Sequence, residues 1–464
     1  MPAASAPGPI VPPAAASSAT GLPRARSRVR GWLTMGLYQP IFLVAFLVYS
    51  PLLLWRSLDR RHRSSLKERM GFLPKSPAGD DVVWIHGVSV GEVKAASNFI
   101  AQLRKQRPDL RIVVSTTTPN GHLVARQEYK DLPVVFYPLD FANFPARAIA
   151  RIRPRCVLLM ELEIWPNFLQ AAHHRGIPVA VINGRISERT FRGYRLARGL
   201  LPQLDLISTY CVQDRAYQKR LLDLGVDSAR VHVTGNMKYD SVVMGDHTSA
   251  RATLRPWLSP KDELVLVAGS THDDEEAVVV RAVDEVLARR GLAVRTVLVP
   301  RHPERAASVC AALEALGRPT VRWSTVGSTL PALDPRTVVV VDTIGQLQRF
   351  YSACDVAFVG GSLVPHGGQN MLEPAAQGRA VIFGPHTTNF RRDVELLREA
   401  DAVLQVPSRE AFPDELGRLL ADAGLRAALG ERAREVITKN QGATARTFDL
   451  VAGLLPAPAV RPQG

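Results

Sequence analysis

Short apolar runs rich in β-branched residues alternate with helix-like stretches along most of the chain, and this alternation restricts the fold more than any other feature. The runs in the first half are Val82–His86, Arg111–Ser115, Val134–Tyr137, Cys156–Met160, Val179–Ile182, Leu206–Val212 and Val231–Thr234. Those in the second half are Leu264–Ala268, Thr296–Val299, Val338–Val341, Val356–Val359, Ala380–Phe383 and Ala402–Val406. Apolar strands separated by helices predict parallel sheets that are covered on both faces. We therefore expect an α/β protein with two doubly wound, Rossmann-like domains facing a cleft.

The 464 residues of the chain are enough for two to three domains. Residues 1–30 are rich in Pro, Ala, Ser and Gly, which predicts a disordered tail. We expect a membrane anchor over 31–55, an N-terminal domain over 56–245 and a C-terminal domain over 246–450, whose last helix could pack back on the first domain. Met35, just before the apolar run, is an alternative translation start.

The four cysteines, Cys156, Cys211, Cys310 and Cys354, are scattered and form no C-x-x-C pair. This spacing favours neither a zinc site nor a disulfide framework, and it suits a reducing compartment. We interpret all four as core residues.

Positive charge is concentrated in one half of the chain. Residues 1–245 contain 33 Lys and Arg against 17 Asp and Glu, whereas residues 246–464 contain 25 against 26. This asymmetry indicates that the first half meets an anionic surface, either membrane phosphate or nucleic acid. An ordinary solvated surface would not explain why the charge lies on one side of the sequence.

Residues Gly31–Trp55 contain no formal charge and end in tryptophans, as a membrane segment does. The segment is long enough to span a bilayer, but Pro40 and Pro51 interrupt it. A secretory signal peptide is the alternative, although arginines follow the run where a cleavage site would be expected. Because basic residues lie on both flanks, the charge rule does not distinguish a span from a segment dipping into one leaflet, and we favour a span.

Two carboxylate-bearing loops follow strands in the first half. Glu92 lies in Gly87-Val-Ser-Val-Gly-Glu92, where a helix is expected to begin, so it could stabilise the helix dipole or accept a proton from an attacking hydroxyl. Glu161 and Glu163 follow the strand Cys156–Met160 and would point the same way if the strand geometry continued. Either could instead pair with an arginine. Arg185 and Arg189 follow Asn183 at a spacing that could seat a phosphate.

Two loops of the second half could meet a phosphate. Val299-Pro-Arg301-His302 presents a cation pair after a strand, and Gly360–Glu373 is a glycine-rich loop leading into a helix. We expect backbone amides near Gly367 and Gly368 to hold phosphate, with Glu373 gripping ribose hydroxyls. The acids Asp273–Glu276 are interpreted as helix-capping and dipole partners. No P-loop, convincing dinucleotide fingerprint or Asp-x-Asp metal motif is present in the sequence.

In this order the loops resemble the 3-deoxy-D-manno-octulosonic acid (Kdo) transferases of lipid A biosynthesis. The motifs are His86-Gly-Val-Ser-Val-Gly-Glu92, Glu161-Leu-Glu163-Ile-Trp-Pro-Asn167, Asn183-Gly-Arg185, Thr234-Gly-Asn236-Met-Lys238-Tyr-Asp240, Gly269-Ser-Thr-His272, Pro300-Arg-His-Pro-Glu-Arg305 and Gly367-Gly-Gln-Asn370 with Glu373-Pro. The resemblance implies a GT-B glycosyltransferase on the cytoplasmic face of the inner membrane. It implies inverting, metal-independent transfer of Kdo from CMP-Kdo to a lipid A precursor in lipopolysaccharide synthesis, with no cofactor.

The resemblance also implies roles for residues. Glu92 would be the general base. The acceptor would meet Glu161, Glu163, Asn183, Arg185 and Arg189, and the donor would meet Gly269, Ser270, Arg301, His302, Gly361, Ser362, Gly367, Gly368, Asn370 and Glu373. Gln369 stands where many members of the family carry histidine, so we expect it to tune the phosphate loop.

Two rival functions remain open from the sequence. One is another membrane-associated GT-B nucleotide-sugar transferase or an epimerase. Binding of a cytidine nucleotide rather than a uridine nucleotide would distinguish this chain from those enzymes. The other is a membrane-bound nucleic-acid or scaffold protein, suggested only by the isoelectric point near 10.1. Only 6% of the residues are aromatic and no nucleic-acid motif is present, so we expect no nucleic-acid partner.

Overall fold

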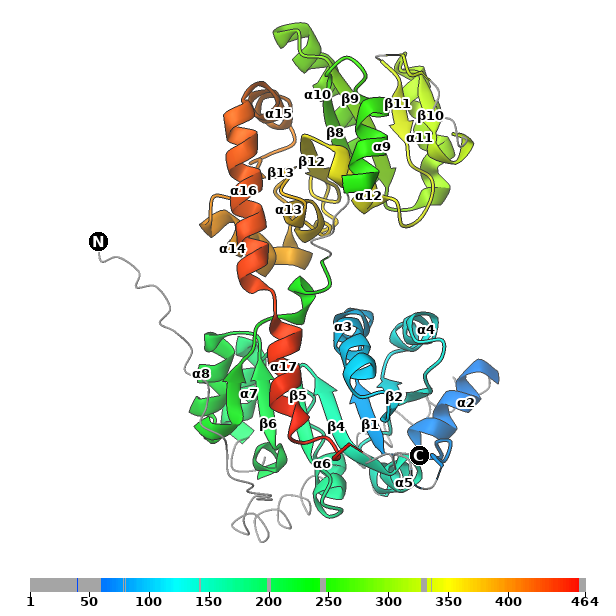
Figure 1. Ribbon diagram of the computed structural model, residues 1–464, viewed down its shortest axis with the longest axis vertical. Helices are drawn as coiled ribbons and strands as arrows, with labels where there is room; N and C mark the ends of the chain where they lie inside the picture. Colours follow the sequence, from blue (N-terminus) through cyan, green and yellow to red (C-terminus); the bar gives the residue numbers. More distant parts are fainter. Residues whose placement is uncertain are drawn as a thin grey trace, which may run out of the picture. The chain divides into compact units, whose positions relative to one another are not determined.

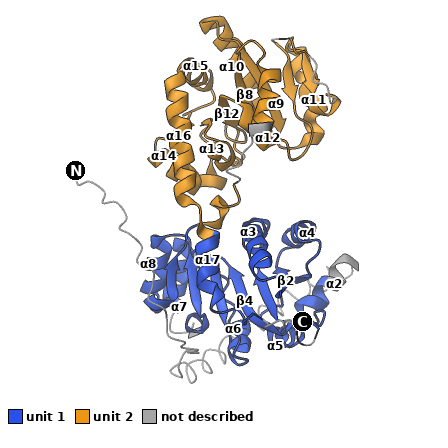
Figure 2. Ribbon diagram, in the orientation of Figure 1, with its two compact units in different colours: residues 1–235, 444–464 blue, residues 236–443 orange. Residues whose placement is uncertain are grey.

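The computed structural model describes residues 40, 60–77, 79, 81–141, 143–197, 202–242, 248–326, 332–334 and 336–458. The chain forms two compact units, residues Met1–Gly235 with Thr444–Gly464, and residues Asn236–Ala443 (Figure 2). The first division therefore falls ten residues before the expected boundary at 245. The expected tail and nearly all of the expected membrane anchor lie outside the described residues. Among the residues that were described, no helix is both long and apolar enough to cross a membrane.

Unit 1 is built on a seven-stranded parallel sheet in the order β3-β2-β1-β4-β5-β6-β7. Its strands are β1 (Val82–His86), β2 (Arg111–Thr116), β3 (Val134–Phe136), β4 (Pro154–Met160), β5 (Val179–Gly184), β6 (Thr209–Val212) and β7 (Val231–Val233). The helices that precede or connect these strands are α2 (Arg60–Arg69), α3 (Val90–Gln106), α4 (Pro119–Glu128), α5 (Phe144–Ile152), α6 (Pro166–His173), α7 (Glu188–Ala197) and α8 (Arg215–Asp223), and α17 (Ala443–Ala452) joins the unit from the other end of the chain (Figure 1). Strands β1, β4 and β5 are almost wholly buried, which explains their continuous apolar sequences.

Unit 2 repeats this architecture with the strand order β10-β11-β9-β8-β12-β13-β14, again parallel in every pairing. Its strands are β8 (Leu264–Thr271), β9 (Val294–Pro300), β10 (Thr320–Arg322), β11 (Val338–Val340), β12 (Val356–Val359), β13 (Ala380–Phe383) and β14 (Leu404–Gln405). Its helices are α9 (Thr248–Leu258), α10 (Glu275–Arg290), α11 (Ala306–Ala315), α12 (Leu347–Ala353), α13 (Leu372–Ala376), α14 (Arg391–Glu399), α15 (Phe412–Ala421) and α16 (Ala423–Asn440). The α/β class and the two Rossmann-like sheets are confirmed.

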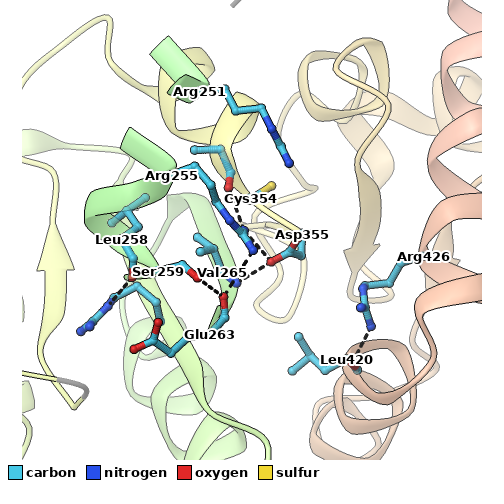
Figure 3. Close-up of polar contacts among 12 residues, drawn as sticks. Arg251, Arg255, Leu258, Ser259, Glu263, Val265, Cys354, Asp355, Leu420 and Arg426 are labelled. Atoms are coloured by element: carbon cyan, nitrogen blue, oxygen red, sulfur yellow. Dashed lines mark hydrogen bonds and ion pairs between the residues drawn. The ribbon is translucent and has the colours of Figure 1, made fainter. Parts of the chain in front are cut away.

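Partly buried hydrogen bonds link the segments at the end of the unit 2 sheet where strand β8 begins. Asp355, just before β12, accepts hydrogen bonds from Arg255 of α9 at 2.6 Å and from the Val265 amide at 2.8 Å (Figure 3). Arg255 also donates to the Ala353 carbonyl at 3.1 Å. These contacts fix β8 against β12 at their amino ends and leave the carboxyl ends to the loops described below.

All four cysteines are free and buried, in agreement with their interpretation as core residues. Burial raises the pKa of Cys156, Cys211 and Cys354 to about 12, because a thiolate in an apolar interior loses its hydration. These three thiols are therefore inert at neutral pH.

Candidate active site

Each sheet has one topological switch point, where chain connections leave neighbouring strands in opposite directions. In unit 1 this point lies between β1 and β4, and in unit 2 it lies between β8 and β12. Open α/β sheets bind ligands beyond the carboxyl ends of the strands at such points. Glu92 follows β1 and Glu161 follows β4, so both predicted carboxylates belong to the switch point of unit 1.

Glu92 lies in the first turn of α3, which begins at Val90. Its Oε2 accepts a hydrogen bond from the Val88 amide and its Oε1 accepts one from the Ser89 hydroxyl, both at 2.8 Å. The residue is only 7% exposed. Each carboxylate oxygen keeps a further lone pair, so the group can still accept a proton from a hydroxyl brought to it.

Glu161 does not continue the strand, so the condition on which Glu161 and Glu163 were expected to point the same way is not met. Strand β4 ends at Met160, and Glu161 adopts a left-handed backbone with φ +58°. The Glu161 carboxylate pairs with Arg185 Nε at 2.6 Å. A non-glycine residue at positive φ is strained, and this strain is held by the Glu161 amide, which donates to the Ile182 carbonyl at 2.9 Å.

The three carboxylates of this site affect one another. Burial raises the pKa of Glu161, the negative charge of Glu92 raises it further, and Arg185 opposes the shift. Burial and the charge of Glu92 raise the pKa of Glu163 to about 7, with the Trp165 indole opposing the shift. Glu163 is therefore partly protonated near neutral pH and can donate a hydrogen bond as well as accept one.

The structure does not bring every predicted acceptor residue to these carboxylates. Asn183 is buried at the end of β5 with φ +53°, and its carbonyl accepts a hydrogen bond from Gln213 Nε2 at 3.0 Å, so its backbone shapes the turn toward Arg185. Arg189 is exposed on α7 and forms no hydrogen bond or ion pair with any residue in the described ranges. It can meet only a ligand that reaches that helix.

In unit 2, Glu275 organises the glycine-rich loop that follows β12. Its fully buried carboxylate accepts hydrogen bonds from the amides of Gly361 (2.7 Å), Ser362 (3.1 Å), Leu363 (2.9 Å) and His272 (2.9 Å). The sequence interpretation of Glu275 as a helix-capping acid missed this role. No local signal could have revealed it, because three of the four donors lie 86 to 88 residues away.

The amides of this loop are committed to the protein itself. Those of Gly361 and Ser362 bind Glu275, and that of Gly368 donates to the Gly361 carbonyl at 2.7 Å. The Gly368 amide, one of those expected to hold a phosphate, is therefore already engaged within the protein, and a contact of Gly361 or Ser362 with the donor would have to use other atoms than these amides. The Ser362 hydroxyl is also occupied, because it donates to the Val359 carbonyl and accepts from the Gly384 amide at 2.9 Å.

The glycines of this loop serve its shape. Gly361, Gly367 and Gly368 have φ of +65°, +85° and +77°, which favours glycine at each position. Gly269 has a packing role, since a Cβ there would lie 2.0 Å from the Tyr351 hydroxyl in the core. Ser270 beside it has φ +55°.

The remaining predicted donor residues are polar side chains at the same edge. Asn370 Nδ2 donates to Glu373 Oε1 at 2.9 Å, which orients that carboxylate. Arg301 and His302 follow β9 and are exposed. His272, which sequence reasoning left without a role, stacks on His366 with ring centroids 4.3 Å apart. No group of three or more possible metal ligands occurs in the part of the chain that the structure describes.

Comparison with known proteins identifies the family. Residues 64–241 match the family model of 3-deoxy-D-manno-octulosonic-acid transferase (kdotransferase). The chain is 35% identical to the 3-deoxy-D-manno-octulosonic acid transferase of Haemophilus influenzae, over 84% of this chain and 91% of that protein. The chain belongs to the Kdo transferase family. It is therefore a glycosyltransferase, as the sequence motifs predict.

Solved structures give further comparisons. The C-terminal CMP-Kdo binding domain of WaaA from Acinetobacter baumannii is 30% identical, covers 41% of this chain and 96% of that domain, and has a TM-score of 0.37. The HepE protein of Anabaena in complex with UDP is 13% identical, covers 81% of this chain and 99% of that one, and has a TM-score of 0.50. The second likeness concerns the fold alone. Together with the two parallel seven-stranded sheets, it shows that the chain has the GT-B fold.

Proposed function

We propose that this Kdo transferase moves Kdo from CMP-Kdo to a lipid A precursor in lipopolysaccharide synthesis, and that unit 1 binds the acceptor while unit 2 binds the donor. The carboxylate cluster of Glu92, Glu161 and Glu163 at the unit 1 switch point supports this most directly. A sugar acceptor offers hydroxyls, which carboxylates and the partly protonated Glu163 can both recognise.

Transfer proceeds by a single displacement without a metal ion. An acceptor hydroxyl oxygen attacks the anomeric carbon of Kdo while its proton passes to the Glu92 carboxylate. The bond from that carbon to the phosphate oxygen breaks, and CMP leaves with the electron pair. Attack opposite the leaving group inverts the anomeric centre. Arg301 stabilises the charge that grows on the departing phosphate.

The decisive experiment supplies the purified protein with CMP-Kdo and a tetraacyl lipid A precursor and follows the product by mass spectrometry. We expect a mass increase of one or more Kdo units and release of CMP. Transfer from a UDP-sugar instead, or epimerisation of a nucleotide sugar, would contradict the proposal.

The role of Glu92 has a separate test. We expect Glu92→Ala to lower kcat by roughly 10²-fold or more, because the attacking hydroxyl loses its proton acceptor. CMP-Kdo binding should persist, since Glu92 belongs to unit 1. Glu128→Ala on the exposed face of α4 is the matched control and should retain full turnover. Near-normal turnover of the Glu92 variant would remove Glu92 from the mechanism.

We also propose that the protein acts at the cytoplasmic face of the inner membrane. The uncharged stretch over 31–55 and the arginines that follow it support this location, as does the exposed arginine row Arg189, Arg192 and Arg195 on α7. In cell fractionation, the full chain should pellet with inner-membrane vesicles. A chain that begins at residue 60 should bind those vesicles more weakly, and its binding should fall as salt is raised.

A further inference from the structure

We propose that His272, His366 and Gln369 of unit 2 form a seat for the carboxylate of the donor sugar, separate from the phosphate seat at Arg301. This inference rests on the proposed function, because it concerns the second negative charge of CMP-Kdo. Kdo is a 2-keto sugar acid, so its anomeric carbon carries both the carboxylate and the link to phosphate. The donor therefore presents two anions only a few bonds apart.

The seat is assembled from two loops at the switch point of unit 2. His272 follows β8, whereas His366 and Gln369 belong to the loop after β12 (Figure 1 labels both strands). The His272 and His366 rings are stacked at 4.3 Å with an interplanar angle of 22°. Gln369 Nε2 lies 3.1 Å from His272 Nε2. With the amide nitrogen donating, His272 Nε2 accepts and its proton resides on Nδ1, which leaves an N–H for a ligand.

The local backbone is shaped to admit these side chains. Gly361 has φ +65°, and a Cβ there would lie 3.2 Å from His272 Cδ2 and 3.5 Å from Gln369 Cγ. A larger residue would crowd the His272 ring, and the positive φ would strain its backbone. The Glu275 carboxylate accepts hydrogen bonds from the His272 amide at 2.9 Å and from the Gly361 amide at 2.7 Å. These two bonds fix the distance between the loops. This arrangement is built into the fold before any donor binds.

The cluster lacks a counter-charge of its own. Glu275 is engaged with amides, Glu276 with Thr271 and Arg305, and Asp273 with Arg305. Glu304 lies 3.5 Å from His302 Nδ1. His272, His366 and Arg301 have no carboxylate partner among the described residues.

The pKa of His272 agrees with this charge imbalance. Burial lowers the pKa first, and the neighbouring basic side chains of His366, His302, Arg305 and Arg301 lower it further. The lowered pKa favours the neutral form of the His272 imidazole, which can donate one N–H to an anion.

The phosphate and the carboxylate of the donor would bind to two different subsites. The guanidinium of Arg301 presents several N–H groups that suit a phosphate, whereas imidazole and amide N–H groups suit a monovalent carboxylate. Nucleotide sugars without a carboxylate would leave the imidazole seat unfilled, so the seat selects sugar-acid donors.

The test compares CMP, which lacks the sugar acid, with CMP-Kdo, by isothermal titration of the full-length protein. His272→Phe and His366→Phe keep an aromatic ring for stacking but remove the N–H groups. We expect each to raise the Kd of CMP-Kdo at least 10-fold and to change the Kd of CMP less than twofold. Arg301→Ala should raise both, and His174→Phe on the exposed surface of unit 1 should change neither. Retained CMP affinity also shows that each variant is folded.

Three outcomes would overturn the inference. The first is an equal loss of affinity for CMP and CMP-Kdo in the phenylalanine variants, which would assign the imidazoles to the nucleotide. The second is no change for either ligand, and the third is a wild-type protein that binds CMP-Kdo no more tightly than CMP. If the wild type binds CMP-Kdo more tightly through the histidines but makes no Kdo product, the proposed function fails and this inference stands.

Discussion

Glu163 shows how burial, together with a nearby like charge, sets the behaviour of a single residue in unit 1. Burial and the nearby charge of Glu92 raise its pKa to about 7, from an ordinary value of 4.5. Between these two values the folded protein holds a proton that the unfolded chain releases. Stability contributed by this group is therefore present at pH 4.5 and is lost as the pH rises toward 7.

We expect Glu163→Gln to remove this pH dependence. The Tm of the variant should match that of the wild type near pH 5 and exceed it at pH 8 by a few degrees, on the order of 3 °C. Differential scanning calorimetry across this range measures the difference. Glu128→Gln on the exposed face of α4 controls for a general effect of carboxylate removal. Parallel Tm curves for wild type and Glu163→Gln would show that Glu163 titrates normally.

At the scale of elements, a single side chain of α10 fixes the loop that follows β12. Glu275 lies at the first position of α10, and it joins the loops after β8 and β12 through four amide hydrogen bonds. Without the Glu275 carboxylate, these four amides would lose their acceptor. Each buried donor without an acceptor costs about 1–3 kcal/mol, so Glu275 stabilises the present course of the loop.

We expect Glu275→Ala to destabilise the protein by roughly 3–5 kcal/mol in urea unfolding, through the loss of a buried, fully bonded carboxylate. The milder Glu275→Gln keeps the volume but replaces one acceptor oxygen with a donor that faces amide N–H groups. It should fold and raise the Kd of CMP-Kdo, because the His272 loop loses its support. Glu285→Gln, on an exposed turn of the same helix, should leave both quantities unchanged. An unaltered Kd in Glu275→Gln would limit Glu275 to a folding role.

Element positions were largely predictable from sequence because buried parallel strands carry a strong apolar signal. The runs Val356–Val359 and Ala380–Phe383 coincide with β12 and β13. Strand β10 was missed, since three residues at a sheet edge, two of them half-buried and one exposed, lack that signal. Of the site, sequence order located the loops, but neither the left-handed turn at Glu161 nor the Glu275 bonds could be predicted, because both depend on contacts between distant segments.

At the scale of the whole molecule, the two units differ in how the chain composes them. Unit 2 is one continuous segment, Asn236–Ala443, whereas unit 1 also needs Thr444–Gly464. Helix α17 (Ala443–Ala452) supplies this return segment (Figure 2). Its Phe448 packs on Phe99 with ring centroids 6.2 Å apart, and Arg446 Nε donates to the Thr234 carbonyl at 2.8 Å.

This asymmetry predicts that the units differ in autonomy. The fragment 236–443 should unfold cooperatively by itself and bind CMP, because its linker contacts, such as Lys238 with Asp393 at 2.6 Å, are internal. The fragment 60–235 should be only marginally stable, because it loses the buried side chains of Phe448 and Val451. Burial of each contributes about 1.5–3 kcal/mol, whereas the free energy of unfolding of a whole protein is only about 5–15 kcal/mol. Joining residues 444–458 to it through a flexible linker should restore cooperative unfolding. Circular dichroism during thermal unfolding distinguishes these cases, and a fragment 60–235 as stable as its joined form would show that α17 contributes little to unit 1.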